Sequence, residues 1–545
     1  MASIFDVGSS ALTSIQRAMA TTGNNIANVN TDGYSRQDVL LATRSPESSG
    51  GVQFGTGVSI NDVRRAYDRF LTAEVVSRQG SNGFYSSYTA SAERTDALLS
   101  DPGTSLSGAL DTFFAAMEAV SASPTSASER QVVIAEANTL VDRFHYLDNR
   151  LRDQAEELNA RVETLQVDIN LYAREIAQLN QSISRAQTGV NGTPNDLLDQ
   201  RDRAISELSA LIKVETVTQK DGSVDIVIGR GQRLVTGNEA ETLSVSAENR
   251  SDGPIRVFLS APSGGESDIT ALMVGGQFGG AIEASKDLVD RSRRELGLLA
   301  IGIAKTFNEQ HQNGLDLNGQ TGGDFFDVGD PLVTGRLNNS GGSVVTATVS
   351  EVAALTGDSF TLSYTAEGVR LTNNTSGQTQ LLQGSPVDID GVTLEFSDAN
   401  PNLVGDEFLI EPTAGAAASF SVVITDGAEI AAAGAGGGVG DNRNVRALIG
   451  LGDSSPLLNG TRGYRGMYNT TVSNIAVETR SAQANAKTED ALLQSALDRR
   501  DSVVGVNLEE EAANLIRYQQ AYQAAAQVIS TANDSFDTLI RATSR

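Results

Sequence analysis

The chain has 545 residues, of which 39% are hydrophobic and 20% are charged, so several domains with apolar cores are expected. Its net charge of −27 argues against nucleic-acid binding and against attachment to an anionic membrane surface. The absence of cysteine excludes disulfides, cysteine-ligated zinc and a thiol nucleophile.

The first 30 residues carry a helical repeat. Apolar or small residues recur at alternating steps of three and four, which is the heptad pattern of a coiled-coil seam. The members of this seam are Phe5, Gly8, Leu12, Ile15, Met19, Thr22, Ile26 and Val29. The segment lacks the basic and apolar regions of a secretory signal, and no run of the chain is apolar enough to cross a bilayer. We therefore expect a protein that is either cytosolic or exported with its N-terminus intact.

An asparagine-rich stretch, NNIANVNTDGYSRQ at residues 24–37, follows this helix. Asparagine is a mediocre helix former and a good turn former, so the helix is predicted to end here. Gly33 can adopt the positive φ that a chain reversal often needs. The stretch therefore predicts a turn that sends the chain out to the next domain.

The middle of the chain alternates between helical and β patterns. Residues 128–186 predict one long helix, in which the apolar repeat slips by one step between Leu151 and Leu158. A short helix is expected at 195–212, a hairpin at 214–229 around Asp221-Gly222, and a further helix at 278–311.

Residues 340–413 are rich in β signals. Within them GDSFTLSY (357–364) and GDEFLIEP (405–412) are either a weak internal repeat or two hairpin starts. The glycine- and alanine-rich stretch at 431–442 is typical of a linker.

The last 40 residues repeat the seam of the first 30. Its members are Leu508, Glu511, Leu515, Tyr518, Tyr522, Ala525, Ile529, Ala532, Phe536 and Leu539. Matching seams at the two ends predict that the terminal helices pair, which closes the chain into a long loop. The sequence thus predicts a multidomain, discontinuous α+β fold with a coiled-coil core of terminal helices, a long helical bundle domain and a β-rich outer insert.

The terminal segments have little apolar surface for their length. About six apolar side chains, at roughly 1.5–3 kcal/mol each when buried, do not offset the ordering of some 30 residues at about 1–2 kcal/mol each. We therefore expect both ends to become ordered only when copies of the chain assemble.

No catalytic, cofactor or metal site is predicted. The two histidines, His145 and His311, lie on different elements, and His311 is expected to act as a cation at a helix end. The stretch from Asp316 begins like a calcium loop, but Thr321 and Asp327 break that pattern. Phosphate-binding, nucleophile-elbow and dinucleotide motifs are absent, so we expect a protein that is not an enzyme.

Two stretches identify a family. NNIANVNTDGYSRQ resembles the N-terminal signature of flagellar axial proteins, the rod, hook and hook-associated subunits, and residues 505–540 resemble their shared C-terminal helix. Interior stretches at 194–208, 305–326 and 440–448 are similar to the junction subunits of this family, which lie between hook and filament.

The resemblance implies a structural subunit that is exported unfolded by the flagellar type III apparatus, without a cleaved signal, and forms a ring outside the cell. Expected partners are further copies of the chain, the hook protein, the second junction protein and an export chaperone on the C-terminal helix. Nucleic acid and membrane are not expected partners. The implied domains are 1–45 and 505–545 (inner core), 46–325 with 440–504 (helical rod) and 326–439 (outer β insert).

The assembly interface implied by the seams and the turn has sixteen residues: Phe5, Leu12, Ile15, Met19, Ile26, Val29, Asn30, Gly33, Tyr34, Leu508, Leu515, Tyr518, Tyr522, Ile529, Phe536 and Leu539. Alternatives are another axial subunit, such as the hook protein or the second junction protein, a secreted adhesin, or a muramidase that travels with the rod.

Overall fold

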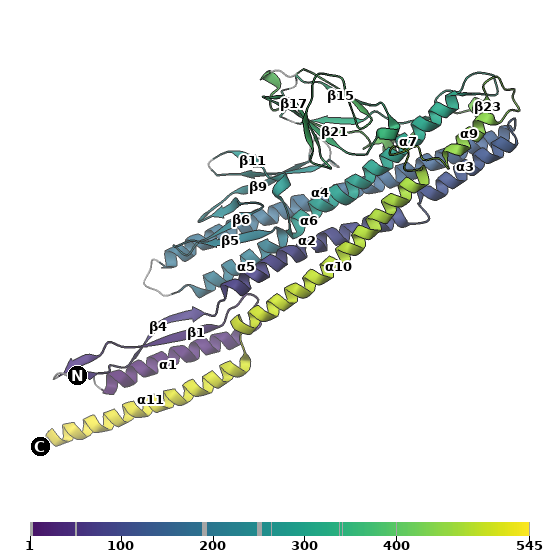
Figure 1. Cartoon of the computed structure of the whole chain (residues 1–545). Helices are drawn as coiled ribbons and strands as arrows, with labels where there is room; N and C mark the ends of the chain where they lie inside the picture. Colours follow the sequence, from purple (N-terminus) through teal and green to yellow (C-terminus); the bar gives the residue numbers. More distant parts are fainter. Residues whose placement is uncertain are drawn as a thin grey trace.

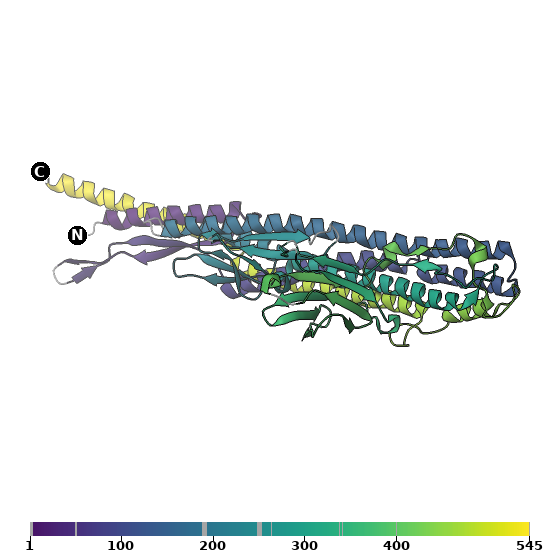
Figure 2. The ribbon, with the colours of Figure 1, turned by 90° about the horizontal axis from the view of Figure 1, so that it is seen from above.

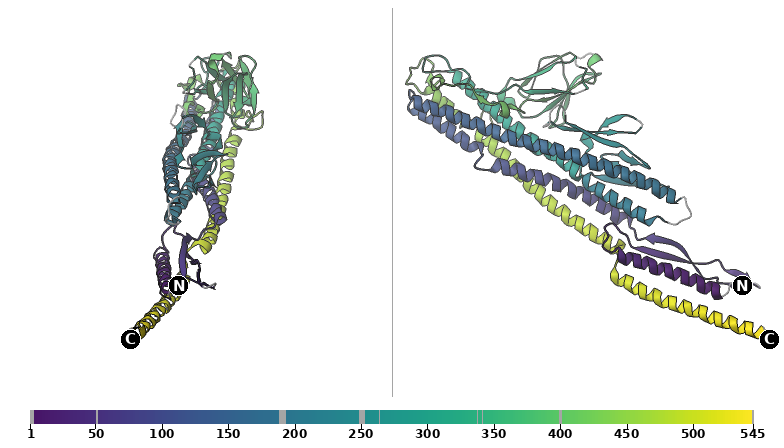
Figure 3. Two further views of the ribbon diagram at one scale, coloured as in Figure 1. Left: turned by 90° about the vertical axis from the view of Figure 1, so that its left-hand side faces the viewer. Right: turned by 180° about the vertical axis from the view of Figure 1, so that it is seen from behind.

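The computed structural model describes residues 4–49, 52–187, 193–247, 253–262, 264–336, 338–340, 342–398 and 401–543. The molecule is elongated: long helices run side by side along it, and small sheets lie along one flank (Figures 1 and 2). Both ends of the chain lie at the same end of the molecule (Figure 3). The predicted α+β fold class, with paired terminal helices, is confirmed.

The end that holds both termini consists of two helices and a long hairpin, which we call the terminal unit. Its elements are α1 (Ile4–Ala27), β1 (Gln37–Thr43), β2 (Glu47–Ser49), β3 (Val52–Phe54), β4 (Val58–Arg65) and α11 (Leu508–Thr543). β1 pairs with β4, and β2 with β3, in antiparallel register. The hairpin runs back along α1, so the chain reverses after its first helix as the asparagine-rich turn predicts.

The central part, which we call the rod, is a bundle of helices around one apolar core. Its helices are α2 (Arg69–Ser100), α3 (Leu106–Ala122), α4 (Ala127–Gln187), α5 (Asn195–Leu211), α6 (Gly276–Ala284), the π-helical segment η2 (Ser285–Asp290), α7 (Arg291–Gln312), α9 (Arg443–Leu451) and α10 (Tyr464–Val504). The helices expected at 128–186, 195–212 and 278–311 are confirmed as α4, α5 and the run from α6 to α7.

The slip in the apolar repeat of α4 has a structural counterpart. Gln154 and Ala155 are buried where the apolar spacing misses its step. The Gln154 amide donates to the Ser91 carbonyl and to Thr95 Oγ1 of α2, at 3.1 Å in both cases. Because the polar side chain is satisfied by α2, the helix continues through the slip without a break.

Two small sheets lie against α4. Their strands are β5 (Val214–Thr218), β6 (Val224–Ile228), β7 (Gln232–Thr236), β8 (Glu239–Ala240), β9 (Thr242–Ala247), β10 (Ile255–Ser260) and β11 (Glu266–Asp268), with the 3-10 turn η1 (Thr270–Leu272). The orders are β5-β6-β7-β8 and β11-β10-β9. The predicted hairpin at 214–229 is confirmed as β5–β6, and Gly222 in its turn has φ 79°. Amides of α4 hold both sheets: Asn180 donates to Val224 O at 2.9 Å and Asn170 to Leu243 O at 2.7 Å.

The predicted β-rich region is confirmed as a lobe of two antiparallel sheets. Its elements are β14 (Leu332–Gly335), β15 (Val345–Val349), η3 (Val352–Ala354), β16 (Phe360–Thr365), β17 (Gly368–Asn373), β18 (Thr379–Leu381), β19 (Val387–Ile389), β20 (Val392–Phe396), η4 (Pro401–Leu403) and β21 (Glu407–Glu411). The two similar stretches form β16 and β21, which lie side by side with Phe360 opposite Ile410. Only β16 starts a hairpin, with β17, because β21 pairs with β14 and β16.

Short elements join the lobe to the rod, and here the prediction of a linker at 431–442 is wrong in part. They are β12 (Gly314–Leu315), β13 (Phe326–Asp327), α8 (Ala416–Ser419), β22 (Ser421–Val422), η5 (Gly427–Glu429) and β23 (Ala433–Gly434). Ala431 and Ala432 are fully buried, and β23 pairs with β12. Small side chains therefore serve close packing at the start of this stretch rather than flexibility.

Candidate assembly interface

The two terminal helices lie side by side in antiparallel orientation (Figure 1). The amide of Gln16 in α1 donates to the Tyr522 hydroxyl of α11 at 3.3 Å. Gly8, earlier in α1, lies against Ile529, later in α11. Residue numbers rise along one helix as they fall along the other, so the pairing is antiparallel, and Gly8 and Ile529 bring one member of each seam into contact. The predicted pairing of the terminal helices is confirmed.

The six apolar seam residues predicted near the N-terminus are half-buried; five belong to α1 and one to the turn that follows it. They are Phe5, Leu12, Ile15, Met19, Ile26 and Val29. The fully buried positions are small or polar instead: Gly8, Ser14, Ala18, Thr22 and Asn25. Because α1 lies between α11 and the hairpin, small side chains allow both neighbours to approach closely.

The predicted seam of α11 is only partly covered by the rest of the chain. Tyr518, Tyr522 and Ile529 are half-buried, whereas Leu508, Leu515 and Phe536 are exposed at 50%, 38% and 57%. Leu539 belongs to α11, but its side chain lies outside the described residues. Phe536 comes seven residues after Ile529, the residue of α11 that lies against Gly8, whereas α1 begins at Ile4, only four residues before Gly8. α11 therefore extends past the start of α1 (Figure 3), and Phe536 is exposed.

Three further apolar side chains of α11 are exposed and were not predicted from the seam. They are Ile516, Val528 and Ile540. Ile516 and Val528 do not fit the alternating spacing of three and four residues that defines the seam. The seam pattern therefore does not include them. Together with the exposed seam residues, they leave α11 with apolar side chains on more than one face.

The asparagines of the turn are used within the chain. The Tyr34 hydroxyl donates to Asn25 Oδ1 at 2.8 Å, and the Asn25 amide donates to the Gln37 carbonyl at 2.9 Å. Asn28 donates to the Asn24 carbonyl at 2.9 Å, and Gly33 has φ 77°. These bonds fix the reversal that the sequence predicted.

The other two predicted residues of the turn differ in exposure. Asn30 is exposed, and Tyr34 is half-buried against the start of α5. Burial, with the nearby carboxylates of Asp199 and Asp196, raises the pKa of Tyr34 to about 12. Its hydroxyl therefore stays protonated and available as a donor at neutral pH.

Neither histidine is placed for catalysis, and the prediction that His311 acts as a cation is wrong. His311 is fully buried, and its Nε2 accepts from the Ala431 N–H at 2.9 Å. Its Nδ1 then donates to the Gly323 carbonyl at 2.8 Å, which requires a neutral ring. Burial lowers the pKa of His311, because charging it would remove an acceptor in an apolar setting. His145 of α4 bonds the Phe420 carbonyl at 2.8 Å.

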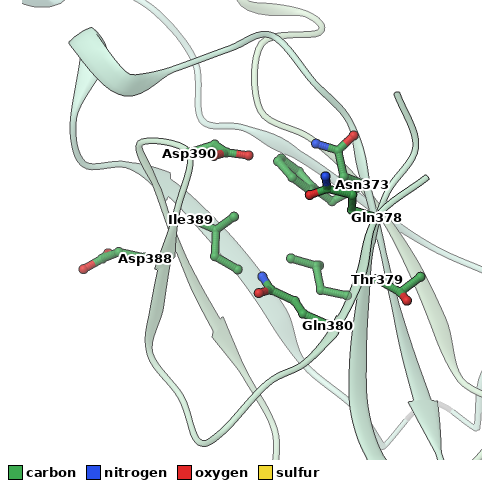
Figure 4. A pocket seen from close by; sticks show the side chains of 9 residues that line it. Asn373, Gln378, Thr379, Gln380, Asp388, Ile389 and Asp390 are labelled. Carbon is green, nitrogen blue, oxygen red and sulfur yellow. The ribbon is translucent and has the colours of Figure 1, made fainter. Parts of the chain in front are cut away.

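A cavity of about 440 Å³ lies in the outer lobe (Figure 4). Its floor includes Phe360 and Leu371, and its rim carries amides and carboxylates such as Asn373 and Asp388. The side-chain Oδ1 of Asn373 accepts from the Thr375 N–H at 2.9 Å, and the Asp388 carboxylate accepts from the Thr393 hydroxyl. These rim groups hold their own loops. In the ranges described, no group of three or more histidines or carboxylates is placed to hold a metal ion.

The stretch that begins like a calcium loop is an ordinary turn. Asp316 Oδ1 accepts from the Asn318 and Gln320 N–H groups, at 2.8 Å each. The carboxylate thus stabilises its own backbone. Among the helices that the structure describes, none is long and apolar enough to cross a membrane.

Comparisons with known proteins agree with this arrangement. Three family models match: "Flagella basal body rod protein" at residues 5–34, "Flagellar hook-associated protein FlgK helical domain" at 92–326, and "Flagellar basal body rod FlgEFG protein C-terminal" at 501–542. The chain is 33% identical to flagellar hook-associated protein 1 of Escherichia coli (strain K12), over 99% of this chain and 100% of that protein.

More distant relatives match as well. Identity to flagellar hook-associated protein 1 of Bacillus subtilis (strain 168) is 25%, over 97% of this chain and 96% of that protein. The structure of the flagellar hook junction protein FlgK from Burkholderia pseudomallei superimposes with a TM-score of 0.72 at 23% identity. It covers 79% of this chain and 100% of that chain, and it shows a shared fold.

The paired terminal helices and the matches at both ends define a structural protein of the flagellar axial class, not an enzyme. Full-length similarity then decides between the members of that class. The chain belongs to the flagellar hook-associated protein 1 family, whose members are structural subunits of the hook–filament junction. The expected family is confirmed, and the hook-protein, adhesin and muramidase alternatives are set aside.

Proposed function

We propose that copies of this chain form a ring between hook and filament, in which α1 and α11 of each copy pack against those of its neighbours as a coiled-coil inner core. The observation that carries this proposal is the set of apolar side chains along α11 that remain exposed in the described structure, among them Leu508, Leu515 and Phe536. Exposed apolar side chains on a long helix favour burial against further helices.

The proposed contacts combine the two seams with the turn. They involve the sixteen residues predicted from the sequence, to which the exposed Ile516, Val528 and Ile540 are added. Burial of these side chains contributes about 1.5–3 kcal/mol of free energy each, and this contribution orders the terminal helices on assembly.

The proposed partners and export route are those that the resemblance to the family implies. The ring contacts the hook protein on one side and the second junction protein on the other, and an export chaperone holds α11 before secretion. The subunit leaves the cell unfolded through the flagellar type III apparatus and acts outside the cell. The absence of cysteine is consistent with passage through a narrow channel, since a disulfide would hinder unfolding.

The proposed division of labour follows the chain. Residues 1–45 and 505–545 form the inner core, residues 46–325 with 440–504 form the rod around it, and residues 326–439 form the outer lobe. The hairpin β1–β4 crosses the border at 45 and packs along α1, so we place it with the inner core.

A deletion strain tests the junction role. Without the protein we expect hooks that lack filaments and flagellin that is lost to the medium. Wild-type protein should restore filaments, and a Phe536→Asp variant should not, because the carboxylate cannot be buried between helices. Val477→Asp is the matched control, since Val477 is 65% exposed but lies on α10 of the rod. Normal filaments with Phe536→Asp would contradict the proposed packing.

Hydrogen exchange on the free subunit tests whether the ends order on assembly. At low concentration we expect fast exchange over residues 1–30 and 508–540 and slow exchange in the rod. Strong protection of both ends in the dilute monomer would reject this part of the proposal.

A further inference from the structure

The joint between the terminal unit and the rod is bridged by the base of the hairpin and the start of α5. Arg65, the last residue of β4, reaches two carboxylates of α5. Its Nη1 lies 2.8 Å from Asp199 Oδ1 and its Nη2 lies 2.6 Å from Asp202 Oδ2. Asp199 and Asp202 are three residues apart, so they share one face of the helix.

This ion-paired group is sheltered from water. The Arg65 and Asp199 side chains are 8% and 10% exposed, and the ring of Tyr67 covers the guanidinium at 4.6 Å from its centroid. A guanidinium has two pairs of N–H groups in a rigid plane, so one arginine can bridge two carboxylates at fixed positions. A lysine has a single charged nitrogen and cannot hold both in the same geometry.

The same face of α5 also fixes the turn and the hairpin backbone. The second oxygen of Asp199 accepts from the Ser35 N–H at 3.2 Å. Asn195 donates to the Val63 carbonyl at 2.7 Å, and the Thr193 hydroxyl donates to Asp62 at 2.9 Å. The turn and the hairpin therefore both meet the rod at the start of α5, along the stretch TPNDLLDQRD at residues 193–202.

The other side of the joint is open. A groove of about 830 Å³ separates the turn from the ends of α2 and α10, and its apolar lining includes Val29, Val76, Leu497 and Val506. Apolar packing across the joint is incomplete on this side. Apart from the bond of Arg36 N–H to the Val504 carbonyl, at 2.9 Å, the described hydrogen bonds between turn or hairpin and rod come from the start of α5 and from Thr193 just before it.

We propose that Arg65 is the positioning residue that fixes where the hairpin leaves the rod. Its bridge to Asp199 and Asp202 holds the base of β4 on α5, and the hairpin in turn carries α1. The consequence for the junction, that the terminal helices enter the ring at a set angle, depends on the proposed function. The positioning itself is a property of the free subunit.

Distance measurements between two spin labels test this role. The chain has no cysteine, so Asn61→Cys in β4 and Lys487→Cys in α10, both exposed, give two unique labelling sites. With Arg65 present we expect one narrow distance distribution by pulsed electron paramagnetic resonance. Arg65→Gln should broaden it at least twofold, and Arg65→Lys should give an intermediate width. A distribution as narrow in Arg65→Gln as in the parent would overturn the proposal.

The neighbouring arginine provides the control. Arg64 is 63% exposed, and among the described residues its ion pair is with Asp62 of its own strand, at 3.3 Å, so Arg64→Gln should leave the distribution unchanged. Far-ultraviolet circular dichroism checks that the rod helices are intact in each variant. If Arg65→Gln does not fold, Asp202→Asn, which keeps the bond to Asp199, should still broaden the distribution, and a narrow one would overturn the proposal.

The two proposals fail separately. Normal filaments from Phe536→Asp would reject the packing of α11 in the ring without changing the label distances. Conversely, a narrow distribution in Arg65→Gln would reject the positioning role and leave the junction role standing.

Discussion

A methyl group added at Gly8 of α1 would lie 2.6 Å from Cγ1 of Ile529 in α11. Real side chains do not approach this closely, so either the Ile529 side chain or the two helices would have to shift. We predict that Gly8→Ala weakens the pairing of the terminal helices by about 1–3 kcal/mol, the usual cost of overpacking. The measurement is the number of filaments per cell when the variant is the only copy, with the secreted protein quantified to show that export is intact.

Gly23 of the same helix is the control for this change. A methyl group there would meet nothing within 4 Å. Gly23→Ala should therefore be neutral or stabilise α1 by up to about 1 kcal/mol, through helix propensity alone. Equal filament numbers for the two alanine variants would contradict the close contact between Gly8 and Ile529.

The turn after α1 depends on the backbone conformation of Gly33. Its φ of 77° is one that a β-branched residue rarely adopts, while the nearest atom to an added methyl group, Cβ of Arg203, is at an ordinary 3.4 Å. Gly33→Val should thus cost about 1–2 kcal/mol through backbone strain and impair filament assembly. Asparagine tolerates this region, so Gly33→Asn should retain most assembly. The measurement is the number of filaments per cell for each variant. Normal filaments with Gly33→Val would show that the turn does not need this conformation.

The buried ring of His311 predicts a pH dependence of stability. Burial lowers its pKa in the folded state below the ordinary 6.5, so the unfolded chain takes up the proton first as the pH falls. The free energy of unfolding should be unaffected above about pH 6.5 and should then decrease, by at most about 1.4 kcal/mol per pH unit, until the pH passes the folded-state pKa. Urea unfolding followed by circular dichroism between pH 7.5 and 5.5 measures this, since the chain has no tryptophan.

Removing the titrating ring separates this effect from general acid sensitivity. His311→Gln should lower stability at pH 7.5, because the bonds to Ala431 and Gly323 are altered, and should flatten the slope below pH 6.5. His145→Gln controls for the loss of a histidine hydrogen bond, here to Phe420. An unchanged slope in His311→Gln would assign the acid sensitivity to other groups.

Elements with a long or local signal could be predicted from the sequence. The helix expected at 128–186 is Ala127–Gln187, because a continuous apolar face over that length has few alternatives. The hairpin at Asp221-Gly222 and the positive φ of Gly33 follow from residues that are adjacent in the chain. The pairing of the two ends could also be predicted, because each end repeats the same spacing.

Contacts between distant residues that share no repeat could not be predicted. Nothing local links Arg65 to Asp199, because a single charge in a strand has no period to match with one in a helix 134 residues later. The linker predicted from composition at 431–442 is wrong in part, because glycine and alanine suit both a solvent-exposed linker and a loop packed tightly against His311. The exposure of Phe536 depends on the relative lengths of α1 and α11, which the seams alone do not set.

The corrected linker region leads to a last prediction, which concerns Arg130 at the start of α4. Its side chain is 1% exposed, and its partners are backbone carbonyls: Pro124 at 2.7 Å, Gly427 at 3.0 Å and Ile430 at 2.6 Å. Burial lowers the pKa of Arg130 from its ordinary value, with Asp316 opposing the shift. The guanidinium therefore holds the segment before β23 on the rod through charge-assisted hydrogen bonds.

Arg130→Met keeps much of the packing volume and leaves three carbonyls without this donor. We predict a loss of about 3 kcal/mol or more in the free energy of unfolding and faster hydrogen exchange at residues 426–434, because buried acceptors without partners are costly. Arg150→Met on the same helix is the matched control. Its guanidinium is exposed, lies 3.9 Å from Asp153 and sits over the Tyr146 ring at the surface, so the change should alter stability by less than about 0.5 kcal/mol. Equal exchange rates in the two variants would mean that Arg130 does not hold this segment, and that strand pairing between β12 and β23 suffices to dock it.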